Sequence, residues 1–213
     1  MKVELLNYTQ LNICSKAIRT CWDSHSRSDN GGPKDQELID RVGNKNKHSS
    51  TLEHLVYTFF ISDISRAVLQ ELARHRMASL SVKSTRYTLK ELKEETSFIY
   101  DNGFDHQFYF DKAKKYVVLT GILEVDKAIV YSLDNLRQLI KKGIKNDKAK
   151  YALPDAYKTE LTWTINLRSL QNFLELRTGQ GALWEIRDLA YMIYDNIPSD
   201  HKYLVADYIY KND

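Results

Sequence analysis

The sequence predicts an α+β domain in which several helices pack against a small, mostly antiparallel sheet. Three observations lead to this prediction. The chain has 213 residues, which favours one compact domain over its whole length, 1–213. Its 43% apolar and 28% charged residues are ordinary for a globular protein, and we see no repeat or linker. Finally, helical patterns cluster around only a few strand patterns.

The first half of the chain begins with strand-like and helix-like segments that are separated by polar loops. The patterns predict a strand at 1–8, a helix at 9–20, a loop at 29–33, a helix at 35–42, a polar loop reaching residue 50 and a strand at 54–61. Ser62 and Asp63 offer an N-cap for a helix at 64–74, where apolar residues have helical spacing. The segment 76–86 has no long apolar stripe and is predicted as an ordered loop.

The second half is richer in helical patterns. The predicted elements are a short strand at 97–100, helices at 111–120 and 125–144, a turn at 151–154, a strand at 160–166, helices at 168–176 and 182–196, and a last short helix near Ser199. In the strand at 160–166, alternation places Leu161, Trp163 and Ile165 on one face.

Charge and composition exclude several classes of protein. A net charge of +3, from 31 basic and 28 acidic side chains, is too balanced for a protein that coats nucleic acid. No apolar run approaches the roughly 20 residues of a membrane span, and the N-terminus lacks a secretory pattern, so we expect a cytoplasmic protein. Cys14 and Cys21 have no paired spacing, so neither a disulfide framework nor a zinc site is expected.

The segment 74–86 is dense in hydrogen-bond donors. It holds three arginines, one lysine and three serines within 13 residues. Phosphates and pyrimidine carbonyls need such donors, and the planar guanidinium suits phosphate. A solvated basic face at a helix end explains the same residues, because cations are favourable there. Composition alone leaves both interpretations open.

Three ordered blocks connect the chain to a known family. The first is Arg74-His75-Arg76, seven further residues and then Ser84, continued by Thr85-Arg86-Tyr87. The others are His48-Ser49-Ser50-Thr51-Leu52-Glu53-His54 and the segment from Asn166 to Arg177, NLRSLQNFLELR. Together they resemble the flavin-dependent thymidylate synthases. The blocks span 48–177, and weaker similarity runs from 17 to 194.

The resemblance implies an activity and a set of ligands. Such an enzyme methylates dUMP to dTMP, with methylenetetrahydrofolate as carbon donor and NADPH-reduced FAD as hydride source. It needs no enzyme nucleophile, because the cofactor carries the redox chemistry. The resemblance also implies a homotetramer with shared sites, and no metal, nucleic acid or membrane partner.

The resemblance also assigns roles to single residues. The residues implied for dUMP are Glu71, Arg74, Ser84, Thr85, Arg86, Lys150 and Arg177, with Arg177 and Ser84 as the catalytic pair. Those implied for FAD are Cys21, His48, Ser50, Glu53, Arg74, His75, Arg76, Met77, Asn166, Arg168 and Asn172. Tyr87 and His48 would lie where flavin and folate meet. Three positions depart from the family pattern, because Glu71, Lys150 and Cys21 stand where Gln, Arg and Ser are usual.

Three other functions remain as alternatives. The basic segment 74–86 could belong to a nucleic-acid-binding module, which steep salt dependence would reveal. A metal-dependent hydrolase could use His48, Glu53, His54 and His75, although the spacing of a zinc-binding helix is absent. A flavoprotein of the same architecture could lack methyl transfer.

Overall fold

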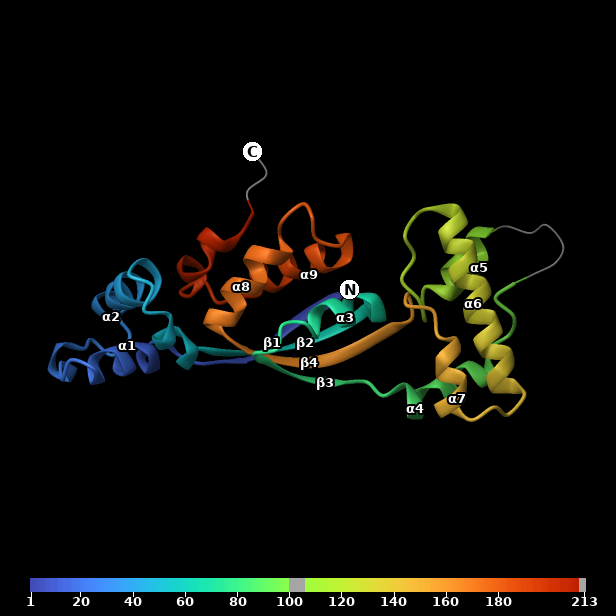
Figure 1. Ribbon diagram of the computed structural model, residues 1–213, viewed down its shortest axis with the longest axis horizontal. Coiled ribbons are helices and arrows are strands. Elements are labelled where there is room, and N and C mark those ends of the chain that lie inside the picture. Colours follow the sequence, from blue (N-terminus) through green and yellow to red (C-terminus); the bar gives the residue numbers. More distant parts are fainter. Residues whose placement is uncertain (100–105, 211–213) are drawn as a thin grey trace. The chain divides into compact units, whose positions relative to one another are not determined.

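The computed structural model describes residues 1–99 and 106–210 of the chain. Within these ranges the strands form one four-stranded sheet (Figure 1). Its strands are β1 (Lys2–Tyr8), β2 (Val56–Ser65), β3 (Ala78–Val82) and β4 (Lys158–Asn166), in the order β1-β2-β4-β3. Backbone bonds from Thr9 to Val56, from Leu167 to Leu55 and from Lys83 to Glu160 show that neighbouring strands run antiparallel.

Helices make up most of the remaining regular structure. They are α1 (Leu11–Thr20), α2 (Pro33–Ile39), α3 (Arg66–Leu72), α4 (Thr85–Thr88), α5 (His106–Ala113), α6 (Leu123–Lys141), α7 (Asn146–Ala149), α8 (Leu167–Arg177) and α9 (Trp184–Asp195). The predicted α+β class and the small antiparallel sheet are therefore confirmed. No helix in the described ranges is long and apolar enough to cross a membrane.

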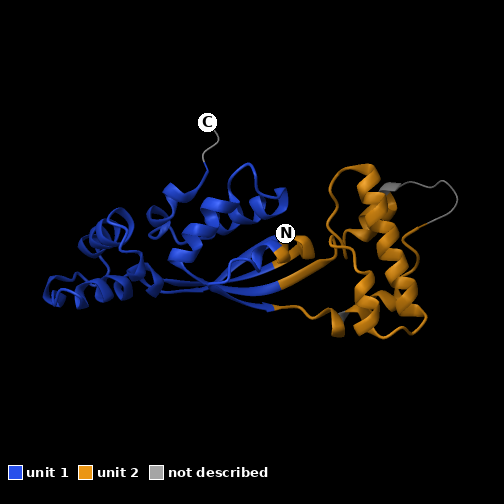
Figure 2. Cartoon of the chain, viewed as in Figure 1, with its two compact units in different colours: residues 1–61, 71–81, 161–213 blue, residues 62–70, 82–160 orange. Residues whose placement is uncertain are grey.

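The chain forms two compact units (Figure 2). The first comprises residues 1–61, 71–81 and 161–213, and the second comprises 62–70 and 82–160. In the first unit, α8 lies against the sheet, where the Phe173 ring meets buried Trp163 edge-on at a centroid distance of 5.0 Å. In the second unit, α6 buries Leu133 and Leu136 against a cluster that includes Phe98 and Tyr116.

The junction of β4 and α8 is built by one residue. Along β4, Leu161, Trp163 and Ile165 are buried, as the predicted alternation requires. Asn166 then ends the strand, and its side chain accepts a hydrogen bond of 2.9 Å from the Ser169 N–H. This is an N-cap, which satisfies a backbone donor that the first helical turn leaves unpaired. The helix therefore starts directly from the strand end, as predicted.

Two predictions near residues 62–86 were wrong. Ser62 and Asp63 do not cap a helix, because β2 continues through Ser65, with Asp63 in a left-handed conformation at φ 60°, and α3 begins only at Arg66. The segment 76–86 is not a loop, since it contains β3 and α4. Strand β3 lies at the edge of the sheet, so pairing with β4 supplies its backbone partners without a long apolar stripe.

Other element boundaries also differ from the prediction. The expected loop before residue 50 is a π-helical turn at Asp40–Lys45, followed by a 3-10 helix at Ser49–His54 that delays the strand. Segment 97–99 is not a strand, because its donors bind the Asp134 carboxylate, and Tyr100 lies outside the described residues. The helix expected at 111–120 is α5, which ends at Ala113. The last predicted helix is only two 3-10 turns, at Lys202–Leu204 and Ala206–Tyr208.

A buried carboxylate organises the N-terminal helices. Asp35 in α2 is fully buried and accepts hydrogen bonds from the Ser15 and Ser28 hydroxyls, the Gly31 N–H and the Arg19 guanidinium, at 2.6–3.0 Å. Burial alone would raise the pKa of this carboxyl, but these donors outweigh it and lower the pKa to about 2. The contacts tie α1, the loop that follows it and α2 together.

Replacing Asp35 with Ala should strongly destabilise the protein, because the buried Arg19 charge would lose its partner. We expect a loss of about 3–5 kcal/mol in the free energy of unfolding, the range typical of a broken buried pair. Denaturant or thermal unfolding measures it. Glu37→Ala, on the exposed side of the same helix, is the control and should change stability little. Equal stability of the two variants would contradict the assigned role of Asp35.

Candidate functional site

A cavity of about 830 Å³ lies within the first unit. Its walls are one face of α8, the segment that follows α3, one residue of the 3-10 helix Ser49–His54 and the loop after α8. The lining residues are Glu53, Arg74, His75, Arg76, Met77, Asn166, Arg168, Ser169, Asn172, Leu176, Arg177, Gly181 and Ala182. Ligand pockets commonly have volumes of roughly 300–1,000 Å³, so the cavity can hold a large organic molecule.

The helical period of α8 places several of its side chains on the face that lines this cavity. Ser169, Asn172 and Leu176 follow one another at spacings of three and four residues, which places them on one helical face. Arg168 and Asn172 are one turn apart on the same side, as predicted. The cap at Asn166 fixes where this face begins, so these side chains enter the cavity at set heights along the helix.

Arg168 makes an ion pair that a ligand can replace. Its Nη1 donates to Glu53 Oε1 at 2.7 Å, while the two side chains are 57% and 44% exposed. Such exposed pairs contribute little to stability, roughly 0–1 kcal/mol. The pair therefore keeps the Arg168 guanidinium at the cavity wall. An anion that replaces the Glu53 carboxylate would cost the fold little stability.

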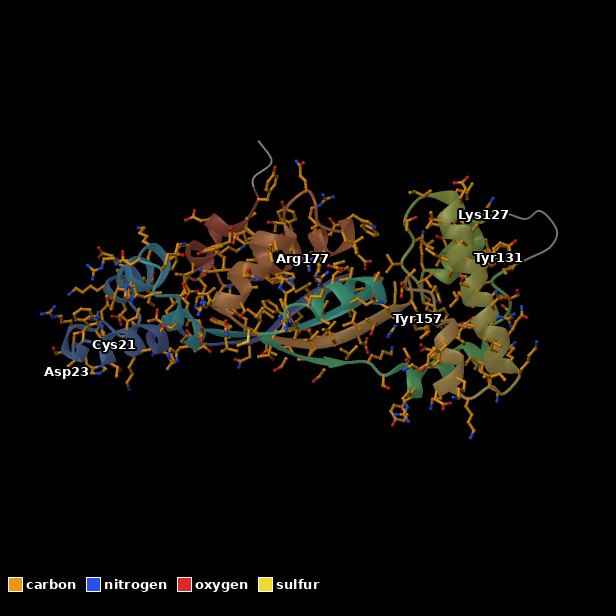
Figure 3. The ribbon with its side chains drawn as sticks, viewed as in Figure 1. Cys21, Asp23, Lys127, Tyr131, Tyr157 and Arg177 are labelled. Atoms are coloured by element: carbon orange, nitrogen blue, oxygen red, sulfur yellow. The ribbon has the colours of Figure 1, made fainter. Side chains whose placement is uncertain are left out.

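Arg177, the last residue of α8, is labelled in Figure 3. It is held far more firmly than Arg168. Its Nη1 lies 2.8 Å from Glu71 Oε2, and its Nη2 donates to the Glu71 carbonyl oxygen at 3.4 Å. Its Nε donates to His75 Nε2 at 3.0 Å. Only 16% of the side chain is exposed, so the cavity meets a guanidinium of fixed orientation.

His75 is neutral in this arrangement. Burial, followed by the nearby Arg177 charge, lowers the pKa of His75 to about 4. Arginine can only donate, so His75 Nε2 must accept and the ring proton resides on Nδ1. The ring also meets Phe173 edge-on at 5.0 Å, which packs it against α8.

The chemistry of the cavity favours anions. Four of its lining residues are arginines, Glu53 is the one carboxylate among the lining residues, and His75 is uncharged near neutral pH. Arginine forks, asparagine amides and an apolar Met77 suit a large planar molecule that carries phosphates. The described residues hold no group of three His, Cys, Asp or Glu side chains that could bind a metal ion.

The cavity collects most of the residues predicted for the flavin. Those that line it are Glu53, Arg74, His75, Arg76, Met77, Asn166, Arg168 and Asn172. His48 lies instead on a second cavity of about 820 Å³, beside residues such as Trp22 and Arg41. Cys21 is an exposed free thiol next to Trp22, and Ser50 is exposed on the 3-10 helix.

The residues predicted for dUMP are divided between the two units. Arg74 and Arg177 line the cavity of the first unit, and the Glu71 carboxylate forms an ion pair with Arg177. Ser84, Thr85, Arg86 and Lys150 belong to the second unit, where Ser84 occupies the N-cap position of α4. There, Asn146 Nδ2 donates to the Arg86 carbonyl oxygen at 2.9 Å, which joins α7 to α4.

Some lining residues were missed by the sequence analysis. Ser169 and Leu176 lie one step before and after Asn172 on the helical face, so extending that periodicity would have found them. Gly181 and Ala182 reach the cavity from the loop after α8, and no local pattern marks them.

Known proteins of one family match this chain along most of its length. The family model described as thymidylate synthase complementing protein matches residues 4–199. A Wolinella succinogenes protein named flavin-dependent thymidylate synthase is 60% identical over 204 residues, covering 96% of this chain and 97% of its own. A Campylobacter jejuni protein of the same name is 55% identical, covering 100% and 99%. The chain belongs to the flavin-dependent thymidylate synthase family.

The fold of this family member also matches a solved structure of a relative. A crystal structure of a Helicobacter pylori flavin-dependent thymidylate synthase, described as complexed with FAD and dUMP, superposes with a TM-score of 0.92. The two sequences are 53% identical, and the match covers 99% of this chain and 100% of the other. The family resemblance seen in the three sequence blocks is thereby confirmed.

The buried neutral His75 should make stability depend on pH. Its folded pKa of about 4 lies below the ordinary value of 6.5, so its contribution is complete above pH 6.5 and is lost as the pH falls toward 4. One proton corresponds to a slope of up to about 1.4 kcal/mol per pH unit. We expect His75→Gln to lose this part of the slope in unfolding experiments between pH 7 and 4.

His201 provides the internal control for this measurement. It is also buried, with a pKa lowered mainly by burial, and it remains in both proteins. Wild type and variant should therefore keep a common residual slope. Identical slopes across the whole range would contradict the buried neutral state of His75.

Proposed function

We propose that this chain catalyses the reductive methylation of dUMP to dTMP, with methylenetetrahydrofolate as carbon donor and reduced FAD as hydride source. The observation that supports this most is the arginine-rich cavity, which gathers most of the residues that the family resemblance assigns to the flavin. Full-length identity above 50% to proteins named for this activity supports the same reaction. We propose NADPH as the reductant.

The residues of the cavity fit FAD in charge and in size. Arg168, Asn166 and Asn172 on α8, with Arg76, Met77 and Glu53, would hold it, together with His75 and Arg74. Cys21, His48 and Ser50 complete the proposed set. When bound, the flavin would supply the hydride that reduces the transferred carbon. The chain's own task is to bind and orient the reactants and to keep charge complementary to them.

For dUMP, we propose Arg74, Ser84, Thr85, Arg86, Lys150 and Arg177 as the binding residues, and Glu71 joins this set through its ion pair with Arg177. Ser84 would donate its hydroxyl hydrogen to the nucleotide, and it would not attack the ring. Arg177 would donate to the pyrimidine and stabilise negative charge as it develops there. We propose that residues 1–213 act as one catalytic domain.

The cysteines suit a mechanism without an enzyme nucleophile. Cys14 is fully buried, and burial raises the pKa of its thiol to about 12, so it carries no thiolate near neutral pH. Its Sγ donates to the Thr51 carbonyl oxygen at 3.2 Å. Cys21 is exposed at the end of α1 and stands in the proposed flavin set in place of a serine.

The first test is the visible spectrum of the purified protein after incubation with FAD and removal of the excess. We expect a retained oxidised-flavin band that shifts when dUMP is added. Arg168→Ala should retain about tenfold less flavin, because it removes a charge-assisted donor from the cavity wall. Arg187→Ala, on α9 and outside the cavity lining, is the matched control and should retain flavin as wild type does.

Two results would contradict the proposal. A wild-type protein that retains no flavin and ignores dUMP would favour the binding-module or metal alternatives. A flavin band that never responds to dUMP would favour a flavoprotein that lacks methyl transfer.

We propose that the protein is a cytoplasmic homotetramer. A chain of 24.9 kDa must accommodate FAD, dUMP and folate, which favours sites shared among subunits. Its substrates dUMP, folate and NADPH are metabolites of the cytoplasm.

Light scattering coupled to size exclusion should therefore report a tetramer. Four chains of 24.9 kDa give a mass of about 100 kDa. The measurement should be made at micromolar concentration, with and without FAD. A mass near one chain under both conditions would contradict the tetramer.

A further inference from the structure

Three acceptors in one short segment, residues 71–75, contact the guanidinium of Arg177. The carboxylate and the carbonyl oxygen of Glu71, together with the imidazole of His75, take one donor each from Nη1, Nη2 and Nε. An arginine has five N–H groups, of which two belong to each terminal nitrogen. Within the described part of the chain, one N–H on each terminal nitrogen thus remains for a ligand in the cavity.

These three contacts set the direction of the remaining N–H donors of Arg177. A free arginine side chain carries about 2 kcal/mol of rotamer entropy, part of which is lost when it binds a ligand. Here the Glu71 side chain, only 31% exposed, and the buried His75 ring have already removed that freedom. Pre-organised donors bind more tightly, because the cost of ordering them does not fall on the ligand.

The contact with Glu71 also lowers the net positive charge that a ligand meets at Arg177. The Glu71 carboxylate, 2.8 Å from Nη1, offsets much of the positive charge of Arg177. A nearly neutral pair with two fixed donors suits the uncharged carbonyl edge of a pyrimidine better than it suits a phosphate. The exposed Arg74 and Arg76 on the same cavity suit phosphate better.

We propose that Glu71 is a positioning residue, which acts on the pyrimidine of the substrate by holding Arg177 and makes no contact with the nucleotide itself. This inference rests on the proposed function, because it takes dUMP as the ligand. It revises the role that the family resemblance implies for Glu71, which is direct nucleotide binding. The neutral His75, accepting from Nε, completes the same support.

Two substitutions of Glu71 separate geometry from charge. Glu71→Gln keeps the length of the side chain and an acceptor oxygen but loses the charge. Glu71→Asp keeps the charge but is one methylene shorter, so it cannot reach Nη1 without moving the guanidinium. If Glu71 positions Arg177, then Glu71→Gln should bind dUMP within about threefold of wild type, whereas Glu71→Asp and Glu71→Ala should each bind about tenfold more weakly.

The measurement is a titration of each flavin-loaded variant with dUMP, followed by the change in the flavin spectrum. The same substitutions are then made in an Arg177→Ala background, where we expect Glu71→Ala to change dUMP affinity less than twofold. Glu175→Gln, on the exposed side of α8, loses the same charge and should match wild type. Flavin retention and thermal melting of each variant show that it is folded.

Several results would overturn the inference. Equal weakening by Glu71→Ala with and without Arg177 would mean that Glu71 contacts the nucleotide directly. Weaker binding by Glu71→Gln than by Glu71→Asp would mean that charge, and not position, is required. Unchanged affinity in all folded variants would mean that Arg177 needs no support. A wild-type protein without any response to dUMP would instead refute the proposed function, and this inference with it.

Discussion

The candidate site depends above all on the cap that Asn166 forms at the start of α8. By accepting from the Ser169 N–H, its side chain ends the strand and starts the helix at one residue. The buried face of β4 anchors one side of this junction, and Phe173 on Trp163 anchors the other. Because a helix rises about 1.5 Å per residue, the positions of Arg168, Asn172 and Arg177 along the cavity are then fixed.

Two arginines on this helix make similar ion pairs with different consequences. Arg168 pairs with Glu53 where both side chains are largely exposed, so water screens the contact and an anion can replace the carboxylate. Arg177 pairs with Glu71 where little water reaches, and His75 removes its remaining freedom. The first arrangement suits a cation whose carboxylate partner is replaced by a phosphate. The second suits a donor whose position stays fixed. Burial, rather than residue type, separates the two roles.

Most of the residues that line the cavity were predicted through the family resemblance, which rests on three blocks of the sequence. The alternation in β4 and the period of α8 predicted the strand, the helix and the shared face of Arg168 and Asn172. The prediction failed where tertiary pairing overrides local pattern, as in β3, whose serine-rich sequence becomes a strand only because β4 lies beside it. It also did not reveal that Glu71 turns to Arg177, because a contact between residues 106 positions apart leaves no local signal.

This chain joins flavin oxidation to the methylation of dUMP. A single-turnover experiment under anaerobic conditions tests it most directly. The protein, with its bound flavin reduced and excess reductant removed, is mixed with dUMP and methylenetetrahydrofolate, and the products are quantified. We expect one dTMP for each flavin oxidised and release of tetrahydrofolate, because the folate supplies only the carbon. Flavin oxidation without dTMP, or release of dihydrofolate in its place, would contradict it.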